Sequence, residues 1–347
     1  MPSSPAAPDP READEHPALI LANLGTPAEP RPRAVRSFLR EFLSDRRVVE
    51  MHPLLWRPVL EGIILRVRPR ASAAKYATVW RPGEETSRSG SPLMHYSERQ
   101  GELLQQELGE SVQVRIAMRY GQPALQRVMD ELMEAGCRRI ALLPLYPQYA
   151  ASSAGTVVDE AARFILASRN QPELRTVRSF ETAPAYIEAL ATALEQHWRV
   201  HGRPDPAAGE RLLLSFHSIP QAMHDAGDPY RAECERTVEL LSQRLNLPDG
   251  LAQLTFQSVF GPAAWIGPAT IDAVGELGSA GCPRLDVICP GFLSDCLETL
   301  EEINQLNRET FTTAGGGSFH YIPWGNDSDG AIATLAEQAR NVLAGWI

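Results

Sequence analysis

Two stretches of nearly matching sequence decide the fold: EAGCRRIALLP at Glu134–Pro144 and SAGCPRLDVICP at Ser279–Pro290. Each reads as the end of a helix, a glycine stop and an apolar strand that ends at proline. Further matches lie upstream of both stretches in the same order. They pair RIAMRYG at Arg115–Gly121 with TFQSVFG at Thr255–Gly261, and LANLGTP at Leu21–Pro27 with LSFHSIP at Leu214–Pro220. The order predicts two similar α/β domains. The alternative is that strand–helix junctions resemble one another because Gly and Pro recur in turns.

Apolar, β-rich runs alternate with helical patterns along the whole chain, which predicts βαβ units and parallel sheets. Runs such as LLLSF are apolar on both faces, as buried parallel strands require. We expect two Rossmann-like domains, each a parallel sheet flanked by helices, with a cleft between them. Eight strands are predicted at Ala18–Asn23, Val112–Met118, Arg139–Leu145, Leu174–Phe180, Arg211–Phe216, Leu251–Val259, Arg284–Cys289 and Ser318–Ile322.

The predicted helices fill the spaces between these strands, at Arg33–Phe42, Glu98–Glu107, Pro123–Glu134, Gly155–Ser168, Pro184–Val200, Pro229–Leu245, Pro268–Leu277, Asp295–Leu306 and Asp329–Ala344. The predicted organisation is a disordered tail at 1–16, an N-terminal domain at 17–175, a C-terminal domain at 176–325 and a final segment at 326–347 whose helix packs back on the first domain.

Length and composition agree with two globular domains. The chain has 347 residues, against about 150 per domain. It is 44% hydrophobic and 22% charged, and its net charge of −10 gives no overall attraction to nucleic acid. No apolar run reaches the roughly 18 residues of a membrane span, and the first residues do not read as a signal peptide. Five cysteines without a CxxC pair argue against a disulfide framework and favour a reduced, cytoplasmic compartment.

Ligands of open α/β sheets bind beyond the carboxyl ends of the strands. His217 follows the apolar strand Leu212–Phe216 and is expected at such an end. A neutral imidazole there accepts a proton or binds a metal. The alternative is a histidine that is satisfied by a loop carbonyl, and position alone does not separate the two hypotheses.

Three carboxylates open the helix predicted after Pro290. Asp295, Glu298 and Glu302 are spaced i, i+3 and i+7, so an α-helix would place them on one face. A row of carboxylates facing a cleft passes protons or hard cations. The other interpretation is that Asp295 and Glu298 cap the helix N-terminus, and the two interpretations are compatible.

Two further segments each have a functional and an ordinary interpretation. Leu54–Arg70 is apolar with four arginines, which is typical of an amphipathic helix that lines a ligand site or lies on a membrane, and equally of a packed helix with solvated arginines. His197 and His201 are spaced i, i+4 on a helix, as in a metal pair, but they stand at its end, where histidines also favour the helix dipole. No GxGxxG or Walker A pattern follows the first strand.

A set of motifs between residues 18 and 327 resembles the ferrochelatase family in content, order and spacing. The motifs are LGTP at Leu24–Pro27, FLSD at Phe42–Asp45, GSPL at Gly90–Leu93, MRYG at Met118–Gly121, LYPQY at Leu145–Tyr149, SFHSIP at Ser215–Pro220, GDPY at Gly227–Tyr230, FQS at Phe256–Ser258, LETLEE at Leu297–Glu302 and Asn326-Asp327. The resemblance implies the two-domain chelatase fold and the insertion of Fe²⁺ into a porphyrin to give haem. Porphyrin and ferrous iron would then be its partners.

The resemblance also implies roles for particular residues. His217 and Glu298 match the family's active-site histidine and glutamate, and both are expected to contact the incoming metal. Asp295 and Glu302 match its further carboxylates. The expected porphyrin-binding residues are Leu24, Arg46, Arg119, Tyr120, Trp265 and Phe292, with Arg46 and Arg119 as candidate cations for the propionates. Leu54–Arg70 matches the lip of the porphyrin cleft, which makes peripheral membrane contact one hypothesis for this segment.

The chain departs from the family pattern at three places. Val259 stands where the family usually carries Arg or Lys, and Pro82–Ser89 looks like an insertion. Relatives with an iron–sulfur cluster carry a cysteine just after the Tyr-Pro-Gln-Tyr motif and more near the C-terminus. Here Ala150 and Ala151 occupy the first region and no cysteine follows Cys296, so no cluster and no permanently bound cofactor are expected.

Rival interpretations of the activity stay open at this point. They are a chelatase acting on coproporphyrin, a cobalt or nickel chelatase acting on a tetrapyrrole such as sirohydrochlorin, a non-catalytic porphyrin or haem carrier, and a bilobal solute-binding protein. Glu298 favours the iron enzymes over the cobalt enzymes, which usually bring a second histidine. The sequence makes no prediction of oligomeric state.

Overall fold

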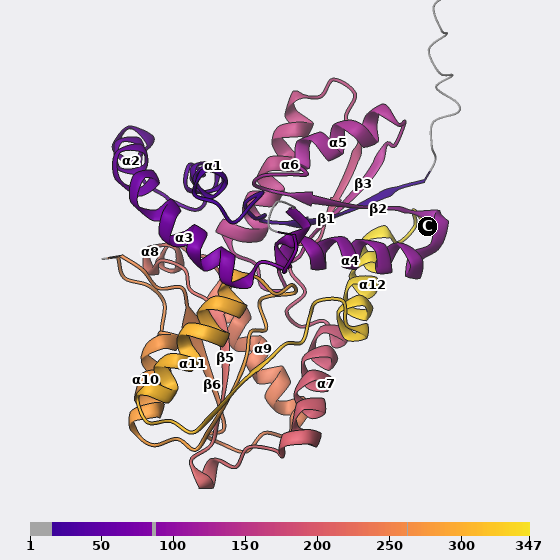
Figure 1. Cartoon of the computed structure of the whole chain (residues 1–347). Coiled ribbons are helices and arrows are strands. Elements are labelled where there is room, and N and C mark those ends of the chain that lie inside the picture. The colour runs from indigo at the N-terminus through magenta and orange to yellow at the C-terminus, as the bar shows by residue number, and fades with distance from the viewer. Residues whose placement is uncertain (1–15, 85–87, 262) are drawn as a thin grey trace, which may run out of the picture.

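The computed structural model of the chain describes residues 16–84, 88–261 and 263–347. Residues 1–15 of the predicted tail and 85–87 of the predicted insertion lie outside the described residues. Eight parallel strands form two four-stranded sheets, one above the other in Figure 1. The strands are β1 Ala18–Asn23, β2 Gln113–Met118, β3 Arg139–Pro144, β4 Glu173–Thr176, β5 Arg211–His217, β6 Ala252–Gln257, β7 Arg284–Ile288 and β8 Ser318–Ile322.

The first sheet has the strand order β2-β1-β3-β4 and the second has β6-β5-β7-β8, so the two orders are the same. Strand ends match as well. Met118 at the end of β2 donates its backbone N–H to the carbonyl of Pro123, and Phe256 in β6 donates to that of Pro268. The prediction of two similar parallel α/β halves is therefore confirmed. We call residues 16–176 the first half and residues 211–322 the second half.

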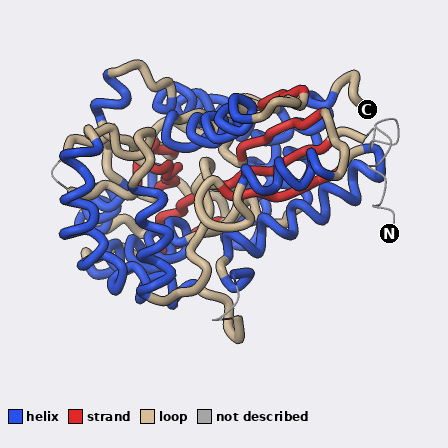
Figure 2. Tube along the Cα trace, turned by 90° about the horizontal axis from the view of Figure 1, so that it is seen from above, coloured by secondary structure: helices blue, strands red, loops and turns tan. Residues whose placement is uncertain are grey.

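Helices surround the strands of both sheets (Figure 2). In the first half they are α1 Pro32–Leu43, α2 Pro53–Val59, the π-helix η1 Leu60–Ile64, α3 Leu65–Val79, η2 Arg88–Gly90, α4 Pro92–Leu108, η3 Gly109–Ser111, α5 Leu125–Glu134, the π-helix η4 Ala151–Gly155 and α6 Thr156–Ala167. The remaining helices are α7 Pro184–His201, η5 Pro206–Ala208, α8 Gln221–Asp225, α9 Tyr230–Leu245, α10 Thr270–Ser279, the π-helix η6 Glu298–Asn307, α11 Arg308–Thr313 and α12 Asp329–Leu343.

All eight predicted strands exist, and β1 and β8 have the predicted bounds. The largest difference is β4, which was predicted to reach Phe180 and ends at Thr176. The backbone N–H of Val177 still donates to the carbonyl of Leu142 in the neighbouring strand β3 at 2.9 Å. Because β3 ends at Pro144, the residues that follow Val177 soon have no strand to pair with.

One apolar cluster spans the two halves, in addition to the clusters that belong to each half alone. A single cluster of buried side chains runs from Leu19 and Leu21 of β1 to Leu212 and Leu214 of β5. Helices α7 and α12 pack against each other and contribute to this cluster, and α12 also packs against α4 of the first half. The carboxyl ends of both sets of strands are therefore held in a fixed relation to each other. In the part of the chain that the structure describes, no helix has the length and apolar character needed to cross a membrane.

Candidate active site

His217 is the last residue of β5 and is partly buried. Its Nδ1 lies 2.6 Å from the carbonyl oxygen of Ser218. A carbonyl only accepts, so the short contact favours the tautomer with the proton on Nδ1. The loop carbonyl that the ordinary interpretation required is therefore present. The same contact leaves Nε2 with a free lone pair, which the functional interpretation requires.

Glu298 and Glu302 are positioned next to His217 by β6. Gln257 is the register partner of His217, and its Nε2 donates to the backbone carbonyl of Glu298 at 2.8 Å. Ser258 follows with a positive φ of 65°. Its backbone N–H and Oγ both donate to the Glu302 carboxylate, at 2.6 and 2.5 Å. One strand end thus fixes both carboxylate-bearing residues.

The Glu302 carboxyl has a pKa above its usual range. Burial is the main cause, the nearby Glu298 carboxylate raises the pKa further, and the Ser258 donors and His217 lower it. His217, Glu298 and Glu302 therefore interact electrostatically at one strand end, and the structure brings these three predicted residues together.

The predicted helix Asp295–Leu306 is corrected at its start. It begins at Glu298 as a ten-residue π-helix, η6, so Asp295 precedes the helix and the three acids do not form one α-helical row. The N-cap residue of η6, Leu297, makes no side-chain cap, so the predicted capping pair is also not formed. Glu298 and Glu302 remain four residues apart on the helix.

Asp295 is buried and fully hydrogen-bonded. Its Oδ1 accepts from Thr299 and Tyr321 at 2.7 and 2.5 Å, and its Oδ2 accepts from the Asn326 side chain at 2.7 Å. Gln100 of α4 holds the same loop by donating to the backbone carbonyls of Leu293 and Asn326. The partners of Asp295 fix the start of η6.

Two tyrosines of the first half face the same site, and sequence reasoning missed both as site residues. Tyr76 of α3 and Tyr146 after β3 have raised pKa values, mainly through burial and also through the Glu298 carboxylate. The Tyr146 hydroxyl accepts the backbone N–H of Leu24 at 2.9 Å and donates to Asn23 at 2.5 Å. Leu24, which is predicted to lie near the porphyrin face, is thus held in place by Tyr146 on the first-half side of the site. Tyr146 lies in the LYPQY motif, whereas nothing in the sequence marks Tyr76.

Helix α3 reaches across to the second half at two points. Lys75 forms an ion pair with Glu301 of η6 at 3.0 Å, and the guanidinium of Arg68 lies 5.0 Å from the ring centroid of Phe260. Burial lowers the pKa of Arg68. The Arg68 contact joins the segment predicted as the lip, Leu54–Arg70, to the loop after β6, and the Lys75 pair joins the next part of α3 to η6.

Arg119 and Tyr120 lie in a buried network. Arg119 is ion-paired with Asp45 and with Glu160, and it also donates to Thr156. The Tyr120 hydroxyl donates to Asp45 at 3.1 Å, and its side chain is fully buried. The donors of both residues point into the first half. Arg119 and Tyr120 would therefore contribute to porphyrin binding indirectly, by holding the first-half side of the site in place.

The other predicted pocket residues differ in exposure. Trp265 is half-buried, packs on Phe260 at a centroid distance of 4.8 Å and belongs to the loop that pairs with Pro220 beside His217. Phe292 is half-buried against the core of the second half. Arg46 is exposed after α1. Val259, in place of the family's usual cation, is 41% exposed.

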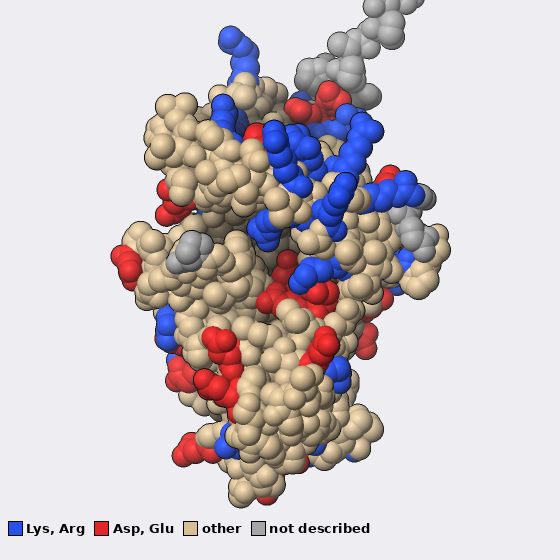
Figure 3. Space-filling view, turned by 60° about the vertical axis from the view of Figure 1, so that its left-hand side comes forward, with Lys and Arg blue, Asp and Glu red and all other residues tan. Residues whose placement is uncertain are grey.

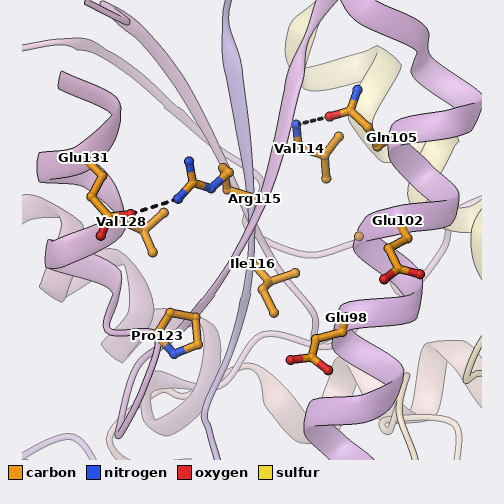
Figure 4. Close-up of a pocket in the computed structure, with 10 residues that line it drawn as sticks. Glu98, Glu102, Gln105, Val114, Arg115, Ile116, Pro123, Val128 and Glu131 are labelled. Carbon is orange, nitrogen blue, oxygen red and sulfur yellow. Dashed lines mark hydrogen bonds and ion pairs between the residues drawn. The ribbon is translucent and has the colours of Figure 1, made fainter. Parts of the chain in front are cut away.

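The surface is hollowed between the two halves, with Lys and Arg side chains above the hollow and Asp and Glu below it (Figure 3). A separate hollow of about 420 Å³ lies at the outer edge of β2, between α4 and α5 (Figure 4). There Arg115 is paired with Glu131 and Gln105 accepts from Val114, so the polar groups in view have internal partners. This second hollow lies away from His217 and holds none of the predicted site residues.

Comparisons with solved structures define the class of protein. SirB from Bacillus subtilis with Fe³⁺ matches with a TM-score of 0.53 and 14% identity, over 73% of this chain and 92% of that one. The sirohydrochlorin chelatase SirB from Bacillus subtilis subspecies spizizenii, in complex with cobalt, matches with a TM-score of 0.50 and 12% identity, over 72% and 90% of the two chains. This chain has the chelatase fold.

Sequence comparison gives the family. The ferrochelatase family profile matches residues 16–343. Proteins named ferrochelatase from Dechloromonas aromatica (strain RCB) and Aromatoleum aromaticum (strain DSM 19018 / LMG 30748 / EbN1) are 49% and 48% identical, over 95% and 96% of this chain and 88% and 89% of their own. One from Chromobacterium violaceum is 46% identical over 94% of this chain and 88% of its own. The chain belongs to the ferrochelatase family, as its motifs predict.

Proposed function

We propose that this protein is a lyase that inserts Fe²⁺ into protoporphyrin IX to form protohaem, the last step of haem biosynthesis. The observation that carries the proposal is the grouping of His217 with Glu298 and Glu302 at the carboxyl ends of β5 and β6. Family membership supports the metal and the reaction class.

The proton chemistry falls to His217. Insertion of Fe²⁺ displaces two pyrrole N–H protons, so a base must face the ring. The Ser218 carbonyl occupies Nδ1 and leaves the Nε2 lone pair to accept a proton. The proton on His217 then lies near Glu302, whose carboxyl interacts with His217. A carboxyl with a raised pKa is also a better proton acceptor, so Glu302 is the next group to take the proton.

The iron needs ligands that replace its water. Imidazole and carboxylate both suit Fe²⁺, and we assign His217 and Glu298 as the groups that contact it. Glu302 extends the acidic surface one turn further along η6. Asp295 acts by positioning, because its carboxylate oxygens already accept from Thr299, Tyr321 and Asn326.

The wall of the site favours a bent ring. A flat porphyrin directs its nitrogen lone pairs into the ring plane, and bending makes them accessible to the metal. Leu24, held by Tyr146, provides a rigid surface in the first half, and Trp265 and Phe292 provide apolar surface in the second. A rigid wall that fits the bent ring better than the flat one lowers the barrier to insertion.

The substrate is tested by anaerobic turnover with purified protein, following the loss of porphyrin fluorescence. Parallel samples contain Fe²⁺ with protoporphyrin IX, Fe²⁺ with coproporphyrin III, and Co²⁺ with sirohydrochlorin. We expect the first pair to give the highest kcat/KM. A preference for coproporphyrin III would replace the proposed substrate. A preference for Co²⁺ and sirohydrochlorin, or porphyrin binding without insertion, would overturn the proposal.

We also propose that the Leu54–Arg70 segment touches a membrane surface. One face of α2, η1 and α3 packs on α1 through Leu60 and Leu65. The opposite face exposes Leu54 at 76%, Leu55 at 68% and Val67 at 68%, beside exposed arginines that favour anionic lipid. Co-sedimentation with phosphatidylglycerol vesicles is expected for the native chain and is lost in the Leu54→Asp/Leu55→Asp variant. Equal sedimentation of both proteins would remove the proposal.

No resident cofactor is proposed, and the location is proposed to be cytoplasmic. The five cysteines are all buried and unbridged, which suits a reducing compartment. Iron quantified in the protein as purified should be far below two atoms per chain, the content of the smallest common iron–sulfur cluster.

A further inference from the structure

A cluster of three histidines lies in the second half, away from the strand ends that carry His217. His197 and His201 come from the last turns of α7, at the lower right of Figure 1, and His320 comes from β8. Their ring centroids are 4.4, 4.8 and 4.9 Å apart. All three imidazoles are therefore in mutual contact.

The buried carboxylate of Asp286 supports this cluster. Asp286 is the register partner of His320 on the neighbouring strand β7, and its Oδ1 lies 2.9 Å from His320 Nδ1. Arg284 and Trp198 occupy the carboxylate as well, donating at 2.8 to 2.9 Å. The carboxylate oxygens of Asp286 thus have several donors, and the contact with His320 favours the tautomer of that histidine with its proton on Nδ1. The lone pair of His320 then lies on Nε2.

An unpartnered nitrogen is the second, independent observation. His197 Nε2 is buried and has no hydrogen-bond partner, and it lies 3.9 Å from Asp286 Oδ1. A buried imidazole nitrogen without a partner costs free energy unless something binds it.

We propose that His197, His201 and His320 bind a divalent transition-metal ion such as Zn²⁺, with Asp286 as the positioning residue that orients His320. Two histidines at i and i+4 on one helix face are a known way to supply two ligands. The candidate ligand atoms of His197, Asp286 and His320 lie within 4.8 Å of one another; His201 is not part of that set, and its ring packs against both other imidazoles. Zinc–nitrogen bonds are about 2.0–2.1 Å long, so binding of the ion would shorten the distances between the ligand atoms by roughly an ångström.

The position of the cluster makes it accessible from solvent and lets a bound ion stabilise the fold. His201 is exposed while Asp286 is completely buried, so the cluster leads from solvent to the core. A bound ion would tie the end of α7 to β8. Since α7 contributes to the core shared by both halves, the ion would stabilise the fold without touching the porphyrin. This inference does not depend on the proposed reaction.

The test uses the full chain with His217→Ala, which removes a metal ligand of the proposed active site. Zn²⁺ alone is measured by equilibrium dialysis, and Co²⁺ alone by its visible absorption. We expect one ion per chain, and a rise in the midpoint of thermal unfolding when Zn²⁺ is added. Adding His201→Ala is expected to weaken binding by at least tenfold and to abolish the rise.

His201 is exposed, so its removal leaves the core intact. The matched control is His52→Ala in the same background, which removes another exposed histidine and is expected to change neither readout. The proposal is overturned if the His217→Ala protein binds no ion. It is equally overturned if His201→Ala and His320→Ala both leave affinity and thermal shift unchanged, since the ion would then lie elsewhere.

Discussion

The two halves have one strand order and differ in what they place at the strand ends. After β2, Arg119 is ion-paired with Asp45 inside the first half. After the equivalent β6, Ser258 donates to Glu302, which remains close to His217. The first half thus satisfies its charges internally and makes a wall, while the second half leaves titratable groups in contact with one another. The same scaffold supports structure in one half and chemistry in the other.

The largest expected effect is the loss of Fe²⁺ insertion when an acid of the second half is removed. Glu298→Gln keeps the size of the side chain and removes its charge. We expect the rate of Fe²⁺ insertion to fall by about 10²–10⁴, as for a lost acid–base or ligand group, with porphyrin affinity nearly unchanged. The control is Glu309→Gln, an exposed position on α11. An insertion rate within tenfold of the native rate would contradict the assignment.

The first half is tested through its buried ion pair. Asp45→Ala leaves Arg119 with only 10% of its side chain exposed and without its main partner. We expect the free energy of unfolding to fall by about 3–5 kcal/mol, the usual cost of breaking a buried pair. Denaturant unfolding measures it, and Asp159→Ala is the control, because Asp159 pairs with an exposed Arg47. A loss no larger than the control's would show that the network does not hold the wall.

Glu302 predicts a pH dependence of stability. Its folded pKa is raised above the unfolded value by burial, so its contribution to stability is present below about pH 4 and is lost as the pH rises through the folded pKa. The Glu302→Gln variant has no carboxyl at this position, so it does not lose this contribution to stability as the pH rises. The stability of the variant relative to the native chain should therefore increase with pH across that window, measured by urea unfolding. A difference that stays flat or decreases would refute the assignment.

The smallest expected effect is at the contact between the halves. Lys75 is 47% exposed, so its pair with Glu301 is screened by solvent. A double-mutant cycle of Lys75→Ala and Glu301→Gln should give a coupling of about 0.2–1 kcal/mol that weakens with salt. A coupling well above that range would mean that the two halves are joined more firmly here than the exposure indicates.

Local pattern predicted the scaffold and the first site residue. Strands such as β1, β3 and β5 are buried, continuous apolar runs and were found for that reason, and His217 follows from its place at the end of one. Contacts between residues far apart in the sequence could not be predicted from local pattern. Glu298 influences the pKa of Tyr76 only because α3 packs against η6. The i, i+3, i+7 argument assumed an α-helix where η6 is a π-helix that begins after Asp295. The motifs also marked Arg119, but not its saturation by Asp45.

The most direct measurement separates binding from insertion in one His217→Ala protein. Porphyrin binding is followed by fluorescence under anaerobic conditions, and Fe²⁺ is then added in a single-turnover experiment. If His217 supplies the base while the apolar walls of both halves hold the ring, protoporphyrin IX binds with nearly native affinity and insertion is lost. Insertion at a rate close to that of the native chain would contradict the account, because the second half would then not supply the base.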